Sequence, residues 1–160
     1  MDMVGIAKEI ATKAHEGQKR WGGEPYITHP AAIAKLVEYL GWHEKTVALG
    51  WLHDVLEDTN ITVADLTLAG IPNDVIESLV AITHKDDEFY LDYLLRVVKN
   101  PSAALVKTLD LCHNLSTSKT GYKHTREKWI MAQWILKKHG YLVPEELNTS
   151  EKLLAILESK

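Results

Sequence analysis

WLHDVLEDT (residues 51–59) is the stretch on which the predicted fold and site depend, because its side chains divide into two opposite faces when it forms a helix. At about 100° per residue, the four polar side chains fall within roughly 140° of one another, whereas the leucine and valine side chains point the other way. The polar set comprises His53, Asp54, Glu57 and Asp58. The pattern predicts a helix over about residues 43–58, with one face toward the core and one face that carries chemistry.

The acidic side chains on this face lack positive charge nearby in the sequence. Asp54 and Asp58 stand four residues apart, where like charges destabilise a helix by roughly 0.2–0.5 kcal/mol. No lysine or arginine occurs between Lys45 and Lys85. A solvated acidic face is the simplest explanation of such a pattern. The histidine beside the acids instead favours a metal ion over a distant lysine as the compensating cation, if other parts of the chain supply further ligands.

Length and composition indicate one globular domain. The chain has 160 residues, of which 46% are hydrophobic and 25% charged. We expect residues 1–160 to form a single domain with a substantial core and no room for a second catalytic domain. The formal net charge of −4 and the lack of a long basic run argue against a nucleic-acid polymer as partner and favour a small ligand.

Cysteine content and hydropathy indicate the compartment. Cys112 is the one cysteine, so no internal disulfide can form. The N-terminal residues lack the basic start and long apolar run of a signal peptide, and no stretch is long and apolar enough to span a membrane. A cytoplasmic protein that does not associate with membranes is therefore expected.

Helical periodicity recurs along the whole chain. It predicts an all-α fold, a compact single-domain bundle of about eight helices. Alternating strand patterns, internal repeats and glycine-rich nucleotide-binding fingerprints do not occur. The expected helices cover residues 4–15, 30–40, 43–58, 62–69, 73–82, 86–99, 101–119, 125–139 and about 150 onward.

A loop rich in glycine and proline, EGQKRWGGEPYITHP (residues 16–30), collects several polar side chains. Its glycines allow the backbone to approach a ligand closely, and Lys19 and Arg20 could meet a phosphate. A solvent-exposed turn with incidental charge is the alternative. His29 precedes Pro30, which we expect at the first position of a helix. The positive end of that helix favours a neutral imidazole able to bind a metal, although a capping role explains His29 equally well.

The helix expected at residues 101–119 carries a polar stripe inside an otherwise apolar segment. The stripe is formed by Asp110, Asn114 and Thr117, at positions i, i+4 and i+7. A carboxylate in such a place needs a partner or a metal ion, because an unpaired charge in a low dielectric is very costly. Lys107 and His113 lie beside the stripe and are expected to be structural or exposed rather than metal ligands.

Four ordered blocks of sequence carry a family resemblance. They are AHEGQKR (residues 14–20), EPYITHP (24–30), LHDVLEDT (52–59) and TLDLCHN (108–114). Together they resemble the hydrolase domain of Rel/Spo-type alarmone enzymes, within the HD superfamily of metal-dependent phosphohydrolases. The resemblance covers roughly residues 14–117, and its order and spacing are far more specific than any single motif.

The resemblance implies a role for individual residues. One divalent metal ion, typically Mn²⁺, would be bound by His29, His53, Asp54 and Asp110. Zn²⁺, Fe²⁺ or Ni²⁺ would also suit this ligand set. The residues that position or activate the attacking water would be Glu57 and Asp58. The substrate contacts would be Arg20 and Asn114, with Tyr26 and Thr117 nearby and Lys19 as a second cation.

The implied reaction removes the 3′-pyrophosphate of ppGpp or pppGpp and yields GDP or GTP with pyrophosphate. A small guanine nucleotide is thus the expected partner, and the length of the chain resembles that of stand-alone hydrolases without a synthetase domain. The chemistry is reasonable in itself, since a bound metal lowers the pKa of water and the two carboxylates can accept its proton. The oligomeric state stays open.

Two departures from the family pattern leave the substrate open. Arg20 is followed by Trp21 and Asp110 by Leu111, where many relatives have a basic residue. The lost charge could weaken binding of a highly phosphorylated nucleotide, and Trp21 could stack on a base or simply pack. The alternatives are a phosphohydrolase acting on the 2′-phosphate of NADPH, a dNTP or a nucleotide phosphodiester, and a non-catalytic nucleotide sensor. A binuclear site would need His84, His113 or His124 near His53.

Overall fold

The computed structural model describes residues 2–118 and 123–159, which form helices and connecting loops with no strand among them. The predicted all-α class is therefore confirmed. In chain order the elements are α1 (Met3–Ala14), α2 (Thr28–Tyr39), α3 (Glu44–Leu52), α4 (Val55–Asp58), α5 (Val63–Leu68), α6 (Asn73–Ile82), α7 (Tyr90–Val97), α8 (Pro101–Thr117), α9 (Lys123–Lys138), the 3₁₀ helix η1 (Glu145–Leu147) and α10 (Ser150–Glu158).

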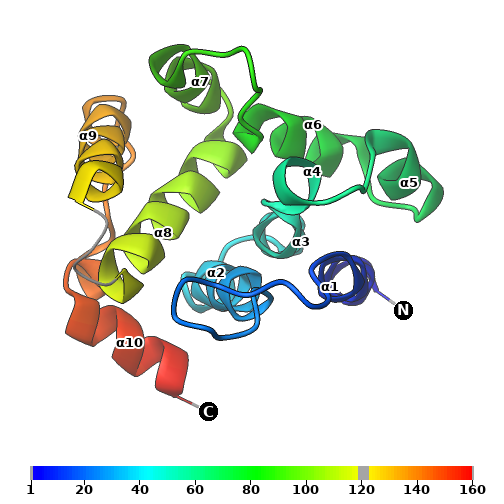
Figure 1. The fold of residues 1–160 in the computed structure, drawn as a ribbon, viewed down its shortest axis with the longest axis horizontal. Coiled ribbons are helices and arrows are strands. Elements are labelled where there is room, and N and C mark those ends of the chain that lie inside the picture. Colours follow the sequence, from blue (N-terminus) through cyan, green and yellow to red (C-terminus); the bar gives the residue numbers. More distant parts are fainter. Residues whose placement is uncertain (1, 119–122, 160) are drawn as a thin grey trace.

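The long helix α8 is the centre of the fold, and Figure 1 shows it running through the middle of the molecule, between α9 and α6. It packs against α2, α3, α6, α7, α9 and α10. From Ala103 to His113 every residue of α8 is buried except Lys107, which is partly exposed. Because α8 is enclosed on nearly all sides, its polar side chains lie inside the protein and need partners there.

The helices α2 and α3 approach each other closely because α3 carries Gly50 where they cross. A Cβ atom at Gly50 would lie 3.0 Å from the Cα atom and 3.1 Å from the N atom of Ala34. These distances are shorter than the optimal separation of packed heavy atoms. His29 lies on α2 and His53 at the end of α3, so this close crossing brings the two imidazoles together.

The prediction of one continuous helix over residues 43–58 is wrong. The helix is interrupted at His53 and Asp54, between α3 and α4, and this split is one reason why ten α-helices appear among the described residues where about eight were expected. Neighbouring side chains of an unbroken helix diverge by about 100°. The interruption lets both side chains reach one point, with His53 Nε2 3.0 Å from Asp54 Oδ2.

The start of α2 also differs from the expectation. The helix begins at Thr28, so Pro30 is its third residue rather than its first, and His29 is buried inside the first turn. Proline is tolerated there because the first N–H groups of a helix have no intrahelical acceptor. The helix has no side-chain cap at its N-terminus, which removes the capping explanation of His29.

The helix expected at residues 86–99 is shorter, and the segment before it folds around Arg96. The guanidinium of Arg96 donates to the Glu88 carboxylate and to three carbonyl oxygens near the end of α6, those of Val80, Ala81 and Thr83. The last carbonyls of a helix lack partners within it and accept such bonds readily. These long-range contacts leave only Tyr90–Val97 helical.

The exposed large apolar side chains include Leu91, Leu95 and Trp134. These three residues belong to α7 and α9, which lie at the periphery of the fold (Figure 1) and pack with one face only. An exposed apolar side chain is common on protein surfaces. Lys119, where the helix through residue 101 was expected to end, lies outside the described residues.

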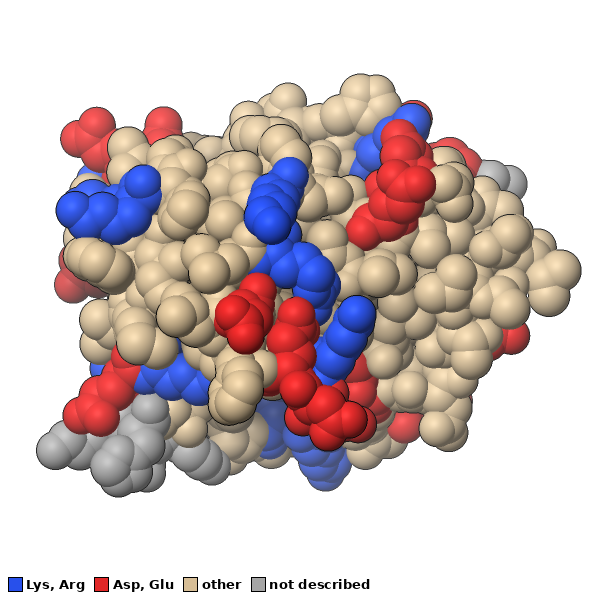
Figure 2. Space-filling view, turned by 90° about the horizontal axis from the view of Figure 1, so that it is seen from above, with Lys and Arg blue, Asp and Glu red and all other residues tan. Residues whose placement is uncertain are grey.

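The surface carries charge of both signs. On the face shown in Figure 2, lysine and arginine side chains lie beside aspartate and glutamate side chains near the middle of the view. Over the described residues, every helix is too short or too polar to cross a lipid bilayer.

Candidate metal centre

Two histidines and two aspartates converge in the interior, although they come from three separate parts of the chain. His29 Nε2 lies 3.0 Å from Asp110 Oδ1, 3.3 Å from His53 Nε2 and 3.7 Å from Asp54 Oδ2. The ligand atoms of His29, His53 and Asp54 all lie within 4.8 Å of one another. The structure thus brings together the four residues that the sequence suggested as metal ligands.

The hydrogen bonds of His53 determine which of its ring nitrogens is free. Its Nδ1 atom lies 2.9 Å from the carbonyl oxygen of Gly50. A carbonyl oxygen only accepts, so Nδ1 carries the proton and donates it. The lone pair of His53 Nε2 therefore faces His29 and Asp54, in the form that a metal ion requires.

A second chain of contacts determines the tautomer of His29. Arg20 Nη1 lies 3.0 Å from His113 Nδ1, and the same nitrogen lies 2.8 Å from His29 Nδ1. A guanidinium only donates, so His113 Nδ1 is an acceptor. The proton between the two imidazoles must then belong to His29 Nδ1. This leaves the lone pair of His29 Nε2 directed at Asp110 and His53.

The centre is therefore lined by acceptors that face one another. With both imidazoles neutral, two lone pairs and two carboxylates face one another at 3.0–3.7 Å with no donor between them. Facing acceptors in a buried place require a cation, and this mixture of nitrogen and oxygen ligands suits a first-row divalent ion. Burial alone would lower the pKa of His53, but the adjacent Asp54 raises it to about 9, so in the metal-free protein a proton on His53 supplies the positive charge that a bound metal ion would replace. The residues present fit a divalent metal ion.

Asp110 has two further partners that hold its carboxylate. Lys107 Nζ donates to Oδ2 at 2.8 Å, and Asn114 Nδ2 donates to Oδ1 at 2.5 Å. Burial would raise the pKa of Asp110, but Lys107 and then His29 hold it well below its usual range. Asp110 is therefore ionised, and its orientation is fixed from both sides.

Lys107 and His113 matter more to the site than their place in the sequence indicated. Both were expected to be merely structural or exposed, yet Lys107 pairs with one metal-ligand candidate and His113 contacts another. A distant lysine thus does contribute to charge compensation at this site. A signal was present for Lys107, since it lies three residues before Asp110 and such spacing brings side chains together on a helix.

The proposed catalytic carboxylates, Glu57 and Asp58, lie beside this centre at the protein surface. Glu57 Oε2 accepts a hydrogen bond of 3.0 Å from the backbone N–H of His84. The Tyr26 hydroxyl lies 2.9 Å from Asp58 Oδ2 and 2.8 Å from Asp54 Oδ2. Burial raises the pKa of Glu57, and burial followed by the charge of Asp54 raises that of Asp58. Both groups are thereby stronger bases than ordinary carboxylates.

Tyr26, expected near the substrate, lines the same cavity as Arg20 and contacts two of the acids. Its ring stacks on the buried His15 with centroids 4.7 Å apart, and its hydroxyl bridges Asp54 and Asp58. Burial, and then the charges of these carboxylates, raise the pKa of the phenol. Tyr26 therefore acts as a hydrogen-bond donor that fixes the acids relative to each other.

The remaining expected substrate contacts form one network around Arg20. Its Nη2 atom donates to Asn114 Oδ1 at 2.9 Å and lies 3.3 Å from Thr117 Oγ1. Lys19 is exposed and lines the same cavity of about 230 Å³ as Arg20 and the metal-centre residues. The structure thus groups these residues on one side of the centre.

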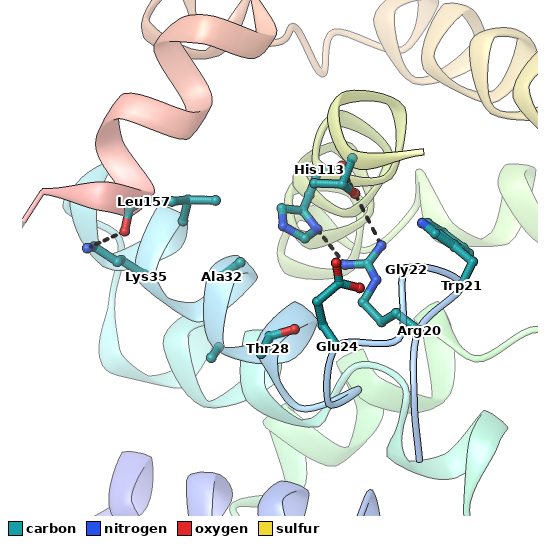
Figure 3. Close-up of a pocket in the computed structure, with 11 residues that line it drawn as sticks. Arg20, Trp21, Gly22, Glu24, Thr28, Ala32, Lys35, His113 and Leu157 are labelled. Atoms are coloured by element: carbon teal, nitrogen blue, oxygen red, sulfur yellow. Dashed lines mark hydrogen bonds between the residues drawn. The ribbon is translucent and has the colours of Figure 1, made fainter. Parts of the chain in front are cut away.

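A second cavity, of about 440 Å³, adjoins the first and shares Arg20 and Trp21 with it. In Figure 3, Arg20 lies between His113 and Trp21, and Lys35 and Leu157 lie at the other end. The Cζ atom of Arg20 lies 4.6 Å from the centroid of the Trp21 ring. The ring centroids of Trp21 and Trp129, which belongs to α9, are 5.7 Å apart. Trp129 also lines the smaller cavity.

A binuclear site would need further histidines, but His84 and His113 form hydrogen bonds with other groups. His84 Nε2 bonds to the carbonyl oxygen of Glu88, and His113 Nδ1 is occupied by Arg20 and His29. The side chain of His124 lies outside the described residues. Within the described part of the chain, the single group of metal-binding side chains found is the one around His29.

The helical fold and the buried histidine–aspartate centre define a domain of the HD type. The family model described as "HD domain" matches residues 7–89. The chain therefore belongs to the HD-domain family, as its four sequence blocks indicated. Asp110 and the rest of α8 lie beyond the matched residues, so their place in the site comes from the structure.

Known proteins similar to this chain agree with the family. This chain is 36% identical over 118 residues to the guanosine-3′,5′-bis(diphosphate) 3′-pyrophosphohydrolase of Haemophilus influenzae. The matched region covers 68% of this chain and 17% of that protein. The chain is 33% identical over 132 residues to a GTP pyrophosphokinase of Streptomyces coelicolor, which covers 76% and 15%. The chain thus spans about a sixth of the length of these relatives.

A solved structure shares the fold. It matches with a TM-score of 0.75 and 20% sequence identity, over 98% of this chain and 94% of the other. That structure is described as a metazoan ortholog of SpoT that hydrolyses ppGpp and plays a role in starvation responses. At this identity the match establishes the common helical architecture.

Proposed function

We propose that this chain hydrolyses the 3′-pyrophosphate of ppGpp and pppGpp to GDP or GTP and pyrophosphate, with one divalent metal ion, preferably Mn²⁺. The observation that carries the proposal is a single cavity lined by metal-ligand candidates, by two carboxylates with raised pKa and by the Arg20 network. The names of the Haemophilus influenzae relative and of the metazoan structure refer to the same nucleotide. We further propose that residues 1–160 form a single domain.

The metal ion would be held by His29, His53, Asp54 and Asp110. When bound, it lowers the pKa of a water molecule and offsets negative charge on the phosphate. The protein's own residues arrange this site through hydrogen bonds to Gly50 and His113, which leave both Nε2 lone pairs free.

Glu57 is proposed as the general base, with Asp58 as its neighbour in positioning the water. The hydrogen bond from the His84 N–H holds one oxygen of Glu57, and the other can take the water proton. The water oxygen bonds to the phosphorus attached to O3′, the P–O3′ bond breaks, and its electron pair passes to O3′, which takes up a proton. Lys107 and Arg20 line the cavity and can balance the phosphate charge.

A second candidate is hydrolysis of another phosphorylated nucleotide, such as the 2′-phosphate of NADPH. The exposed ring of Trp21, which lines both cavities, favours it, because the family resemblance implies a basic residue at this position. An aromatic ring supplies stacking surface in place of charge. The non-catalytic sensor is less well supported, since Glu57 and Asp58 are both present.

The test is a panel of ppGpp, pppGpp, NADPH and dNTPs, assayed with Mn²⁺ and again after addition of EDTA. Asp54→Ala and Glu57→Ala serve as inactive controls. Release of pyrophosphate from ppGpp that EDTA abolishes is the expected result. If folded, Mn²⁺-loaded wild type released none from ppGpp or pppGpp but phosphate from NADPH, the second candidate would replace the first.

A further inference from the structure

His113 is a buried histidine that lies between the metal centre and the substrate side of the cavity. It is 6% exposed, and its ring stacks on that of His29 with centroids 4.9 Å apart and planes inclined by 27°. Its Nδ1 atom lies 2.8 Å from His29 Nδ1 and 3.0 Å from Arg20 Nη1. His113 thus contacts a metal-ligand candidate on one side and an arginine on the other.

These contacts restrict how the protons can be placed. The guanidinium of Arg20 has only donors, so His113 Nδ1 can serve only as an acceptor. His29 must then be the donor in the contact between the two imidazoles. If His113 Nδ1 carried a proton, it would face the donor of Arg20, and His29 would be driven to the tautomer whose Nε2 is protonated and cannot bind a metal.

We infer that His113 is a positioning residue which fixes the metal-binding tautomer of His29 and couples it to Arg20. Groups that orient a metal-binding histidine commonly contribute 10–100-fold to metal affinity. The donor from Arg20 selects the acceptor form of His113, and His113 in turn selects the form of His29. The inference rests on the metal centre of the proposed function but not on the identity of the nucleotide.

The inference predicts an unusual direction for the change in metal affinity when Arg20 is removed. Arg20 is a cation close to the site of another cation, so simple electrostatics predicts that its removal strengthens metal binding. Selection of the His113 tautomer predicts the opposite result. Lys19 is a second cation of the same cavity, and its side chain is exposed whereas His113 is buried, so its removal supplies the matched electrostatic control.

The experiment measures Mn²⁺ affinity by calorimetry in a set of folded variants. His113→Leu removes the acceptor, and we expect the Kd for Mn²⁺ to rise by roughly 10–100-fold. In His113→Asn the amide oxygen can occupy the position of Nδ1, so affinity should stay close to wild type. Cys112→Ala is the packing control, because Cys112 is buried next to His113 on α8 and bonds to Gln133 rather than to the centre.

The coupling is tested by combining Arg20→Ala with His113→Leu. Arg20→Ala should weaken Mn²⁺ binding in the wild-type background and have no further effect once His113 is replaced. Lys19→Ala should leave affinity unchanged or increase it. Histidine ring ¹⁵N spectra of the metal-free protein provide a direct reading, with His29 protonated at Nδ1 in wild type and in mixed tautomers in His113→Leu.

Several outcomes would overturn the inference. These are wild-type Mn²⁺ affinity in His113→Leu, an equal loss in Cys112→Ala, or tighter binding in Arg20→Ala. If His113→Leu does not fold, two variants still test the inference. His113→Asn shows whether an amide oxygen preserves Mn²⁺ affinity, and Arg20→Ala shows whether removal of the arginine weakens or strengthens Mn²⁺ binding. Absence of ppGpp turnover with these Mn²⁺ effects intact would reject the proposed substrate alone, whereas absence of Mn²⁺ binding by wild type would reject the centre itself.

Discussion

Asp54 and Glu57 are three residues apart but should fail in different ways when replaced. Asp54 Oδ2 lies 3.0 Å from His53 Nε2, inside the group of ligand atoms. Glu57 is outside that group, and one of its oxygens accepts from the His84 N–H. We therefore expect Asp54→Ala to lose the metal ion, and Glu57→Gln to keep the metal and lose rate.

The expected magnitudes follow from these positions. Loss of a direct ligand should weaken Mn²⁺ binding at least as much as loss of a supporting group, which is roughly 10–100-fold. Loss of a general base lowers the rate by about 10²–10⁴-fold, equivalent to roughly 2.7–5.4 kcal/mol in activation free energy. The amide oxygen that Glu57→Gln introduces can still accept from the His84 N–H, so this substitution leaves no buried donor unsatisfied.

The assay compares calorimetric Mn²⁺ affinity with the rate of pyrophosphate release at saturating Mn²⁺. Excess Mn²⁺ should partly restore the rate of pyrophosphate release in Asp54→Ala and should not restore it in Glu57→Gln. The raised pKa of Glu57 means that its charged form destabilises the fold at neutral pH, so Glu57→Gln should also raise Tm. Equal loss of Mn²⁺ affinity in both variants would refute this division of roles.

Four further predictions follow from the site. Because burial raises the pKa of Glu57, an NMR titration of the metal-free protein should show its carboxyl group ionising above the ordinary value of 4.5, and ionisation at or below that value would contradict burial as the controlling cause. Gly50→Ala gains about 1 kcal/mol of helix propensity but crowds Ala34 by an overpacking cost of about 1–3 kcal/mol, so Mn²⁺ affinity should fall even where Tm changes little. Trp21→Lys should lower KM for ppGpp by about tenfold, the equivalent of one charge-assisted hydrogen bond of roughly 1.5 kcal/mol, and an unchanged KM would show that the lost charge is unimportant. Nucleotide binding to the inactive Glu57→Gln variant, measured by calorimetry, should require Mn²⁺ and disappear with EDTA; equal binding in both conditions would separate the nucleotide from the metal.

Sequence periodicity predicted most helices because burial of apolar faces determines them. The helices over Met3–Ala14 and Asn73–Ile82, for example, lie close to their expected bounds. The interruption at His53 could not be predicted in this way, because it depends on contacts with residues distant in the sequence. The late start of α7 has the same origin, since Arg96 bonds to carbonyl groups of another helix.

The candidate site was predictable as a set of residues but not as a network. His29 and Asp110 stood out because a histidine near a helix start and a buried carboxylate each need an explanation. His113 did not stand out, since its importance depends on Arg20, which is 93 residues away and reaches it only through the packing of α2 on α8. Hydrogen-bond direction, which decides the tautomers, has no signature in local sequence.

The charges that line the smaller cavity explain why metal and nucleotide should bind together. Among the described residues, three basic and four acidic side chains line it, a formal balance of −1 that a divalent ion changes to +1. Without the ion, the acids that bind the metal would repel a polyphosphate, and Lys107 is already paired with Asp110. Trp21 and Leu111, at positions where the family resemblance implies a basic residue, add no positive charge that would reduce this dependence. The metal ion therefore serves recognition as well as chemistry, and the residues that fix its ligands act on nucleotide affinity through it.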